Sequence, residues 1–335
     1  MRLTENINIG KMQVENRLVM PPMCMYQAKE NSGKVNSFHL GHYTARAIGG
    51  VGLIIVESTG VSPNGRITDQ CLGLWEDDQI PGMKSLVDAV HDQGSKIALQ
   101  INHAGRKSET TNLRHIGPSA IEFNNQELTY EEASLEDIDQ VIESFKQAAQ
   151  RADKAGFDAL EIHAAHGYLI HQFVSPISNK RTDAYGENRF LLLDKIIDEV
   201  KSVWPKDKPL WIRISTSDYL EGGLKVQDWI DYLNTIKEKI DLVHVSAGAI
   251  VNVRIDAYPG YMLDFAREIK KQTGLTTIGV GLLNNQDIID YALKSDACDL
   301  VACGRGLLRN PNLIQEIYKS TDQENRINKS YKRAY

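Results

Sequence analysis

Two imidazoles and a phenol lie within one six-residue segment of this chain, residues 163–168. His163 and His166 can donate hydrogen bonds to a carbonyl oxygen as it gains negative charge. Tyr168 can deliver a proton to a neighbouring carbon. Together these groups suit the reduction of an activated carbon–carbon double bond. Because none of the three supplies a hydride, this chemistry requires a redox cofactor.

The same residues allow two simpler readings. The histidines could bind a metal ion together with His171, but no carboxylate or cysteine accompanies them at a spacing typical of zinc sites. We therefore predict no metal site. Tyr168 could simply pack in a loop, which is the usual fate of a single tyrosine.

Eight short apolar runs recur at intervals that leave room for helices. Most are bounded by Gly, Pro, Ser or Asn, and many are rich in Val and Ile, which is typical of buried parallel strands. The runs are 17–23, 52–57, 96–101, 159–163, 210–215, 241–246, 276–281 and 299–304. This pattern predicts an α/β fold, a single (β/α)8 TIM barrel over residues 1–335, although two doubly wound halves would give the same alternation.

Smaller elements are expected around the barrel. Residues 1–16 predict a β-hairpin that turns at Gly10 and caps the lower mouth. Ser134 begins a capping-box pattern and predicts a helix that ends near Gly156. The loops 102–135 and 167–188 are long and follow strands, where such barrels keep their active sites. The tail 319–335 is polar but carries Tyr331, Arg333 and Tyr335, which suggests that it docks against something.

Composition limits the class of protein. The chain of 335 residues is 42% hydrophobic and 24% charged, as in ordinary globular proteins. Its net charge of −6 argues against nucleic acid or a membrane surface as partner. The N-terminus lacks an apolar signal core, and no window reaches the length of a membrane span. The four cysteines are scattered without a CxxC pair, so we expect reduced thiols and a cytoplasmic protein.

Several strand ends carry residues that could hold a flavin. Gly281 and Gly304 allow close backbone approach and Arg305 adds a positive charge, which together favour a phosphate site, although each glycine alone could simply form a tight turn. Arg213 and Gln100 lie in apolar runs. A buried charge needs an anionic partner, which a reduced isoalloxazine offers.

Each of these assignments has an alternative. Arg213 could form an internal salt bridge to Glu57 or Glu161. Cys24 could be a small buried hydrophobic residue rather than a thiol that tunes the flavin. Lys107 could be a solvated loop lysine rather than a residue that covers the site.

Five ordered motifs, at 16–26, 100–107, 163–169, 175–186 and 304–305, together resemble the old yellow enzyme family of FMN-dependent ene-reductases. The chain is most similar to the bacterial NADPH dehydrogenase branch, sometimes called thermophilic-like, over essentially its whole length. The resemblance implies non-covalent FMN, held by Pro21, Pro22, Met23, Cys24, Ser58, Gln100, Arg213, Gly281, Gly304 and Arg305.

The resemblance also implies roles at the substrate. His163 and His166 would grip the carbonyl oxygen, Tyr168 would be the proton donor, and Tyr26 and Lys107 would line the pocket. Arg333 would enter the active site of a neighbouring subunit, which predicts a homodimer or homotetramer.

The chain departs from the family pattern at a few positions. The segment 185–189 is shorter than usual, which puts substrate access in doubt. Asn102 replaces a small apolar residue and could change the polarity of the pocket. Pro21 and Ser58 replace the more usual residues, although backbone contacts to FMN stay possible.

The expected activity is a ping-pong reaction. NADPH is the reductant, and the acceptor is an electrophilic alkene such as an α,β-unsaturated carbonyl compound, with nitroesters, nitroaromatics or quinones as further acceptors. One alternative is a phosphate-binding barrel that acts as an aldolase or isomerase, which needs a Schiff-base lysine or a carboxylate base. A non-catalytic flavin-binding protein is another.

Overall fold

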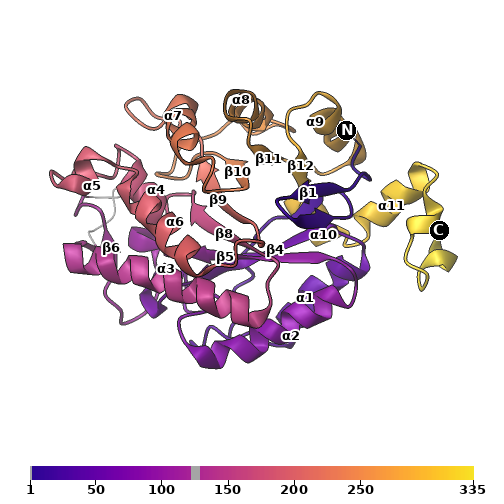
Figure 1. The fold of residues 1–335 in the computed structure, drawn as a ribbon, viewed down its shortest axis with the longest axis horizontal. Helices are drawn as coiled ribbons and strands as arrows, with labels where there is room; N and C mark the ends of the chain where they lie inside the picture. The colour runs from indigo at the N-terminus through magenta and orange to yellow at the C-terminus, as the bar shows by residue number, and fades with distance from the viewer. Residues whose placement is uncertain (1, 122–128) are drawn as a thin grey trace.

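Eight parallel strands close into a barrel with helices around it (Figure 1). The structure is a computed structural model that describes residues 2–121 and 129–335. The strands follow chain order around the barrel, and the last pairs with the first. They are β3 (Leu18–Met20), β4 (Leu53–Gly60), β5 (Lys96–Asn102), β8 (Ala159–Ala164), β9 (Leu210–Ser215), β10 (Leu242–Ser246), β11 (Thr276–Gly279) and β12 (Leu300–Ala302). The predicted (β/α)8 barrel is confirmed, and two doubly wound halves are excluded.

Helices follow the strands and pack on the outer face of the barrel. The larger ones are α1 (Ser37–Ile48), α2 (Ile80–His91), α3 (Leu135–Ala155), α6 (Leu191–Val203), α7 (Val226–Ile236), α8 (Leu263–Thr273), α9 (Gln286–Lys294) and α11 (Leu313–Ser320). Helix α3 begins where the sequence predicts, because the Ser134 hydroxyl accepts from the Asp137 N–H. It ends at Gly156, whose φ of +92° suits a left-handed cap.

Some strands are shorter than their apolar runs. Strand β3 ends at Met20 because Pro21 and Pro22 have no N–H to donate to a neighbouring strand. Strand β4 instead continues to Gly60, with an irregular register between Val56 and Thr59.

The two long loops contain short elements. Residues 102–135 include η3 (Gly105–Lys107) and the two-residue strands β6 (Ile116–Gly117) and β7 (Glu131–Glu132); residues 122–128 of this loop lie outside the described residues. The loop 167–188 holds α4 (Leu169–Val174) and α5 (Ala184–Glu187).

Alternate side chains of each strand point into the barrel and form layers. The lowest layer is apolar and includes Ala98, Ala159, Trp211 and Leu242. The hairpin of β1 (Ile7–Ile9) and β2 (Met12–Val14) turns at Gly10 as predicted, and its apolar residues belong to the same cluster. Above this layer the interior becomes polar.

The polar layer is set by strand register. Gln100 lies opposite Glu161, and His163 lies opposite Arg213. All four side chains are buried. The barrel therefore has an apolar base and a layer of hydrogen-bonding and charged groups beneath its mouth.

The C-terminal segment first packs on its own chain. Gln315 and Asn328 both donate to the Ile48 carbonyl, at 3.1 and 3.4 Å, and Arg326 donates to the Glu15 carbonyl at 2.8 Å. Its last turn, η5 (Lys332–Ala334), is exposed beside α11 (Figure 1). Docking of this tail on a neighbouring subunit stays a prediction. Among the described helices, none has the length and hydrophobicity that a membrane crossing needs.

Candidate active site

His163 stands at the carboxyl end of β8 and is buried. Its Nδ1 accepts a hydrogen bond from the Ala165 N–H at 3.2 Å. The neutral ring therefore carries its proton on Nε2, which is left to donate. The ring centroid lies 5.1 Å from that of His166 and 5.1 Å from that of Tyr168. The structure thus brings together the three residues with which the sequence analysis began.

His166 adopts a left-handed backbone, with φ of +58°, which is uncommon for a residue other than glycine. Its N–H donates to the Ser215 hydroxyl at 3.0 Å, and its Nε2 shares a hydrogen bond of 2.8 Å with the Ser246 hydroxyl. The Lys107 ammonium donates to its carbonyl at 2.9 Å. The ends of β9 and β10 therefore fix this second imidazole above the polar layer.

Burial sets the protonation of all three groups. It lowers the pKa of both His163 and His166 well below 6.5, and the nearby Arg213 charge lowers them further. Burial raises the pKa of Tyr168, and the Cys24 thiol adds to this effect. The site thus presents two neutral imidazoles beside a phenol that keeps its proton.

His171 has a structural role. Its Nδ1 accepts from the Gly167 N–H at 2.8 Å, and its Nε2 lies 2.9 Å from the Asp218 carboxylate. It therefore holds the turn after β8. Within residues 2–121 and 129–335, no group of three or more His, Cys, Asp and Glu side chains is placed to hold a metal ion.

Cys24 packs with Tyr168 against a small cluster that contains Cys71. A hydrogen bond with the Cys71 thiol, followed by burial, raises the pKa of Cys24 well above 9.0. The backbone N–H of Ser58 donates to the Cys24 sulfur, and the Tyr26 hydroxyl is hydrogen-bonded to it. The Cys24 thiol is therefore protonated at neutral pH.

Glu161 is the hub of the polar layer. Its carboxylate accepts hydrogen bonds from Gln100 Nε2 at 2.7 Å, Trp211 Nε1 at 2.6 Å and His244 Nδ1 at 2.7 Å. Because one N–H of the Gln100 amide donates to Glu161, its second N–H and its amide oxygen are left for another partner.

The first testable prediction concerns this hub. We expect Glu161→Gln to lower the free energy of unfolding by about 1–3 kcal/mol, because an amide nitrogen must then face a donor that the carboxylate accepted. Urea unfolding measures this loss. Glu143→Gln, on the exposed face of α3, is the matched control and should leave stability unchanged. Equal stability of both variants would contradict the assignment.

Arg213 is buried in β9, and its Nε has no hydrogen-bond partner. Among the described residues, no carboxylate lies within 4.0 Å of its guanidinium in an ion pair, so the alternative of a salt bridge to Glu57 or Glu161 is not found. Glu57 instead accepts from the Tyr43 hydroxyl at 3.0 Å. Arg213 is therefore a buried positive charge that requires an anionic partner.

A cavity of about 190 Å³ connects Arg213 with the loops after β11 and β12. Its lining includes Pro21, Gly281, Gly304 and Arg305, all predicted from the sequence to bind the cofactor. Pro22 and Met23 continue the same segment. These residues fit FMN. The Arg213 guanidinium, whose Nε has no partner, can pair with the electron-rich edge of the isoalloxazine ring, and Arg305 can pair with the phosphate.

The backbone at Gly281 explains why the position carries no side chain. Its φ is +120°, and an added Cβ would lie 3.1 Å from the Met262 nitrogen. Helix α10 (Gly304–Arg309) begins at Gly304. Helix α9 begins at Gln286, so a short loop separates it from Gly281.

Two further residues lie at the end of β5 and in η3. Asn102 is fully buried, and neither its amide nitrogen nor its oxygen has a partner. Burial lowers the pKa of Lys107 to about 8, and its ammonium donates to the carbonyls of His166 and Ala249. Lys107 is therefore not a solvated loop lysine; it ties the turn after β8 to the segment after β10.

Buried imidazoles predict an acid-sensitive fold. Burial lowers the pKa of His39 and His103 to about 4, and those of His163 and His166 also lie well below 6.5. Below pH 6.5 these histidines bind protons in the unfolded chain but stay neutral in the folded protein. The free energy of unfolding therefore falls as the pH drops, by up to about 1.4 kcal/mol per pH unit for each histidine. Glu57 opposes the trend, since burial raises its pKa to about 7.

We expect the four histidines to outweigh Glu57, so that the protein is less stable at pH 5.0 than at pH 7.5. Urea unfolding at pH 7.5 and pH 5.0, at one ionic strength, measures the change. Equal or greater stability at the lower pH would contradict neutral buried imidazoles.

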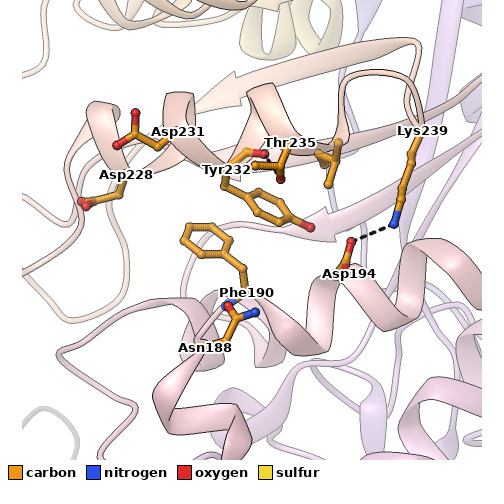
Figure 2. A pocket seen from close by; sticks show the side chains of 9 residues that line it. Asn188, Phe190, Asp194, Asp228, Asp231, Tyr232, Thr235 and Lys239 are labelled. Atoms are coloured by element: carbon orange, nitrogen blue, oxygen red, sulfur yellow. Dashed lines mark hydrogen bonds and ion pairs between the residues drawn. The ribbon is translucent and has the colours of Figure 1, made fainter.

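A larger hollow of about 600 Å³ lies between α6 and α7 (Figure 2). Phe190 stacks on Tyr232 with ring centroids 4.3 Å apart, and Lys239 pairs with Asp194 at 3.1 Å. It contains no histidine or cysteine, and its cation is paired. We therefore place the chemistry at the barrel mouth.

Sequence reasoning did not identify Cys71 or His244 as part of this region, and it named Glu161 only as a possible partner of Arg213. His244 and Glu161 carried the same signal as Gln100, a polar residue inside an apolar run. Cys71 lies in a loop, and its sequence neighbours give no sign of its position.

Comparisons with known proteins agree with this geometry. A model of the NADH:flavin oxidoreductase / NADH oxidase family matches residues 2–324. The NADPH dehydrogenase of Clostridium acetobutylicum is 45% identical, with all of both chains covered, and that of Bacillus subtilis is 46% identical, with 100% of this chain and 99% of the relative covered. A solved old yellow enzyme homologue from Zymomonas mobilis is 26% identical, with a TM-score of 0.82 over 96% of this chain and 93% of that one.

Proposed function

Because the chain belongs to the NADH:flavin oxidoreductase / NADH oxidase family, we propose that it is an FMN-dependent NADPH dehydrogenase that reduces the activated C=C bond of α,β-unsaturated carbonyl compounds. One observation carries the substrate class: His163, His166 and Tyr168 converge at the end of β8, opposite Arg213. Two neutral donors beside one acid suit a carbonyl conjugated to an alkene.

FMN bound here would supply the hydride chemistry, with NADPH as the reductant and the β-carbon of the alkene as the acceptor. Gln100 and Arg213 would hold the ring from the polar layer, Arg213 would stabilise its negative charge, and Arg305 would hold the phosphate. His163 and His166 orient the substrate carbonyl and stabilise the negative charge that develops on its oxygen. Tyr168 donates its phenolic proton to the α-carbon.

We place a polar corner of the substrate pocket at Asn102, the last residue of β5. Asn102 is buried with both amide atoms unpartnered, and an unpaired buried amide favours a ligand that supplies partners. We therefore place alkenes with a second hydrogen-bonding group, such as maleimides, among the better acceptors.

An aldolase or isomerase needs a lysine or a carboxylate base, and Lys107 and Glu161 are both already engaged. The Lys107 ammonium donates to two backbone carbonyls, and the Glu161 carboxylate accepts from three donors. Neither group is available for a Schiff base or for proton abstraction.

Absorbance of the purified protein tests the proposal directly. We expect a flavin spectrum, and NADPH oxidation that accelerates on addition of cyclohexenone or N-ethylmaleimide. A colourless protein that does not bind added FMN would contradict the cofactor. A yellow protein that oxidises NADPH but reduces no alkene would contradict the substrate class alone.

Arg333 completes the proposal as a residue of the neighbouring subunit's active site. It lies in the exposed turn η5, and among the described residues no hydrogen bond joins it to the site of its own chain. Mixing Arg333→Ala subunits with Tyr168→Phe subunits tests the sharing. Each mixed dimer would contain one fully native site, so the mixture should exceed the mean activity of the two variants. Activity equal to that mean would contradict a shared site.

A further inference from the structure

Two of the four cysteines come from segments that are hydrogen-bonded to each other beside the active site. The Ala28 N–H donates to the Gln70 carbonyl at 2.9 Å, and the Gly73 N–H donates to the Gly33 carbonyl at 2.9 Å. Near these contacts Cys24 and Tyr168 pack against a small buried cluster of Ile67, Cys71 and Ala104. Both thiols are free, and they are hydrogen-bonded to each other.

The Cys71 sulfur is held as an acceptor. The Thr68 N–H donates to it at 3.4 Å, and the Thr68 hydroxyl lies 3.6 Å away. The Cys71 N–H in turn donates to the Thr68 carbonyl at 3.1 Å, which closes a tight turn. The sulfur is therefore fixed, and its neighbours are donors that suit a thiolate.

The other two cysteines lie in different surroundings. The hydrogen bond from the Cys24 thiol lowers the pKa of Cys71 to about 6, whereas burial raises the pKa of Cys298 to about 12 and of Cys303 to about 11. One thiolate next to a second thiol is the arrangement that oxidises to a disulfide. Cys298 and Cys303 thus serve as internal controls.

We propose that Cys24 and Cys71 are a redox modification site, and that a hydroperoxide converts them to a reversible intramolecular disulfide. Cys71 is buried and Cys24 is only partly buried, so the peroxide meets Cys24. The proton shared by the two sulfurs passes to Cys71 as Cys24 attacks the O–O bond.

The two steps balance as follows. In the first, a sulfenic acid forms on Cys24, and the peroxide leaves as water or an alcohol. In the second, the Cys71 sulfur attacks the sulfenic sulfur, the S–S bond forms and water leaves. Two thiols are oxidised, and one hydroperoxide is reduced.

The bond would join the segment after β3 to the segment after β4. Its sulfur could no longer accept in the same way from the Ser58 N–H, and the change would lie against Tyr168. Oxidation would therefore alter the wall of the site without touching the imidazoles.

The FMN-loaded protein, treated with hydrogen peroxide, tests this directly. Thiol titration after denaturation should fall from the four cysteines of the sequence to two. After alkylation with iodoacetamide, a non-reducing digest should contain a peptide in which Cys24 is linked to Cys71, two hydrogen masses lighter than the separate peptides. Dithiothreitol should restore all four thiols.

Variants separate the proposal from ordinary overoxidation. In Cys71→Ser, no cross-link should form and Cys24 should oxidise more slowly, because no thiolate accepts its proton, whereas Cys298→Ala should cross-link as the native protein does. If Cys71→Ser fails to fold, Thr68→Val keeps the backbone donor and should slow cross-linking several-fold. Overoxidation of Cys24 at the same rate in the native protein and Cys71→Ser, or a cross-link only between subunits, would overturn the proposal.

Discussion

Tyr168→Phe should slow alkene reduction by roughly 10²–10⁴-fold, the usual contribution of a positioned general acid, while NADPH oxidation in the absence of alkene stays fast. The variant keeps the ring that packs against His163 at 5.1 Å and loses only the phenolic proton. Burial raises the pKa of this phenol, so it keeps its proton at neutral pH. Stopped-flow absorbance, with NADPH and alkene added in separate mixes, measures each half-reaction.

Tyr26→Phe is the matched control for this result. Tyr26 also lies beside Cys24, and burial raises its pKa to about 12, but its side chain is 45% exposed. We expect it to change the apparent affinity for the alkene more than the rate of protonation. If the rates of both half-reactions are unchanged in Tyr168→Phe, the proton comes from another group and Tyr168 is not the general acid.

His163→Ala should lower kcat for alkene reduction by about 10²–10³-fold, the cost of one lost donor to a developing oxyanion. His163→Asn should retain more of the rate, because an amide N–H can still donate from a similar place. The same pair of variants isolates hydrogen bonding from packing, since both remove the ring.

A pH profile provides the second readout for His163. The pKa values of His163 and His166 lie well below 6.5, so both rings are neutral throughout the working range. The rate of alkene reduction should therefore show no titration near pH 6.5. A rate that depends on a group of that pKa and loses the dependence in His163→Ala would show that the imidazole acts in its charged form.

The barrel itself could be predicted from the sequence. Eight runs of Val, Ile and Leu bounded by turn residues require strands buried on both faces, and the spacing between them leaves room for one helix each. The start of α3 at Ser134 and the hairpin turn at Gly10 were local patterns and are confirmed. Strand ends were less predictable: β3 stops at Met20 because proline cannot donate to the ladder.

The three proposed catalytic residues could also be predicted from the sequence, because His163, His166 and Tyr168 are close in sequence and remain close in space. Their surroundings could not. Only the register of β8 against β9 puts His163 opposite Arg213, and only burial makes the imidazoles neutral and the phenol protonated.

The remaining features depend on contacts between distant segments. Cys71 meets Cys24 because the loop after β4 folds back on the segment after β3. Glu161 is the hub of the polar layer because closure of the barrel brings β5, β9 and β10 around one carboxylate. A sequence determines its elements and its local motifs through nearest-neighbour preferences, whereas these pairings arise only when the chain closes, since their energies come from burial and register rather than from adjacent residues.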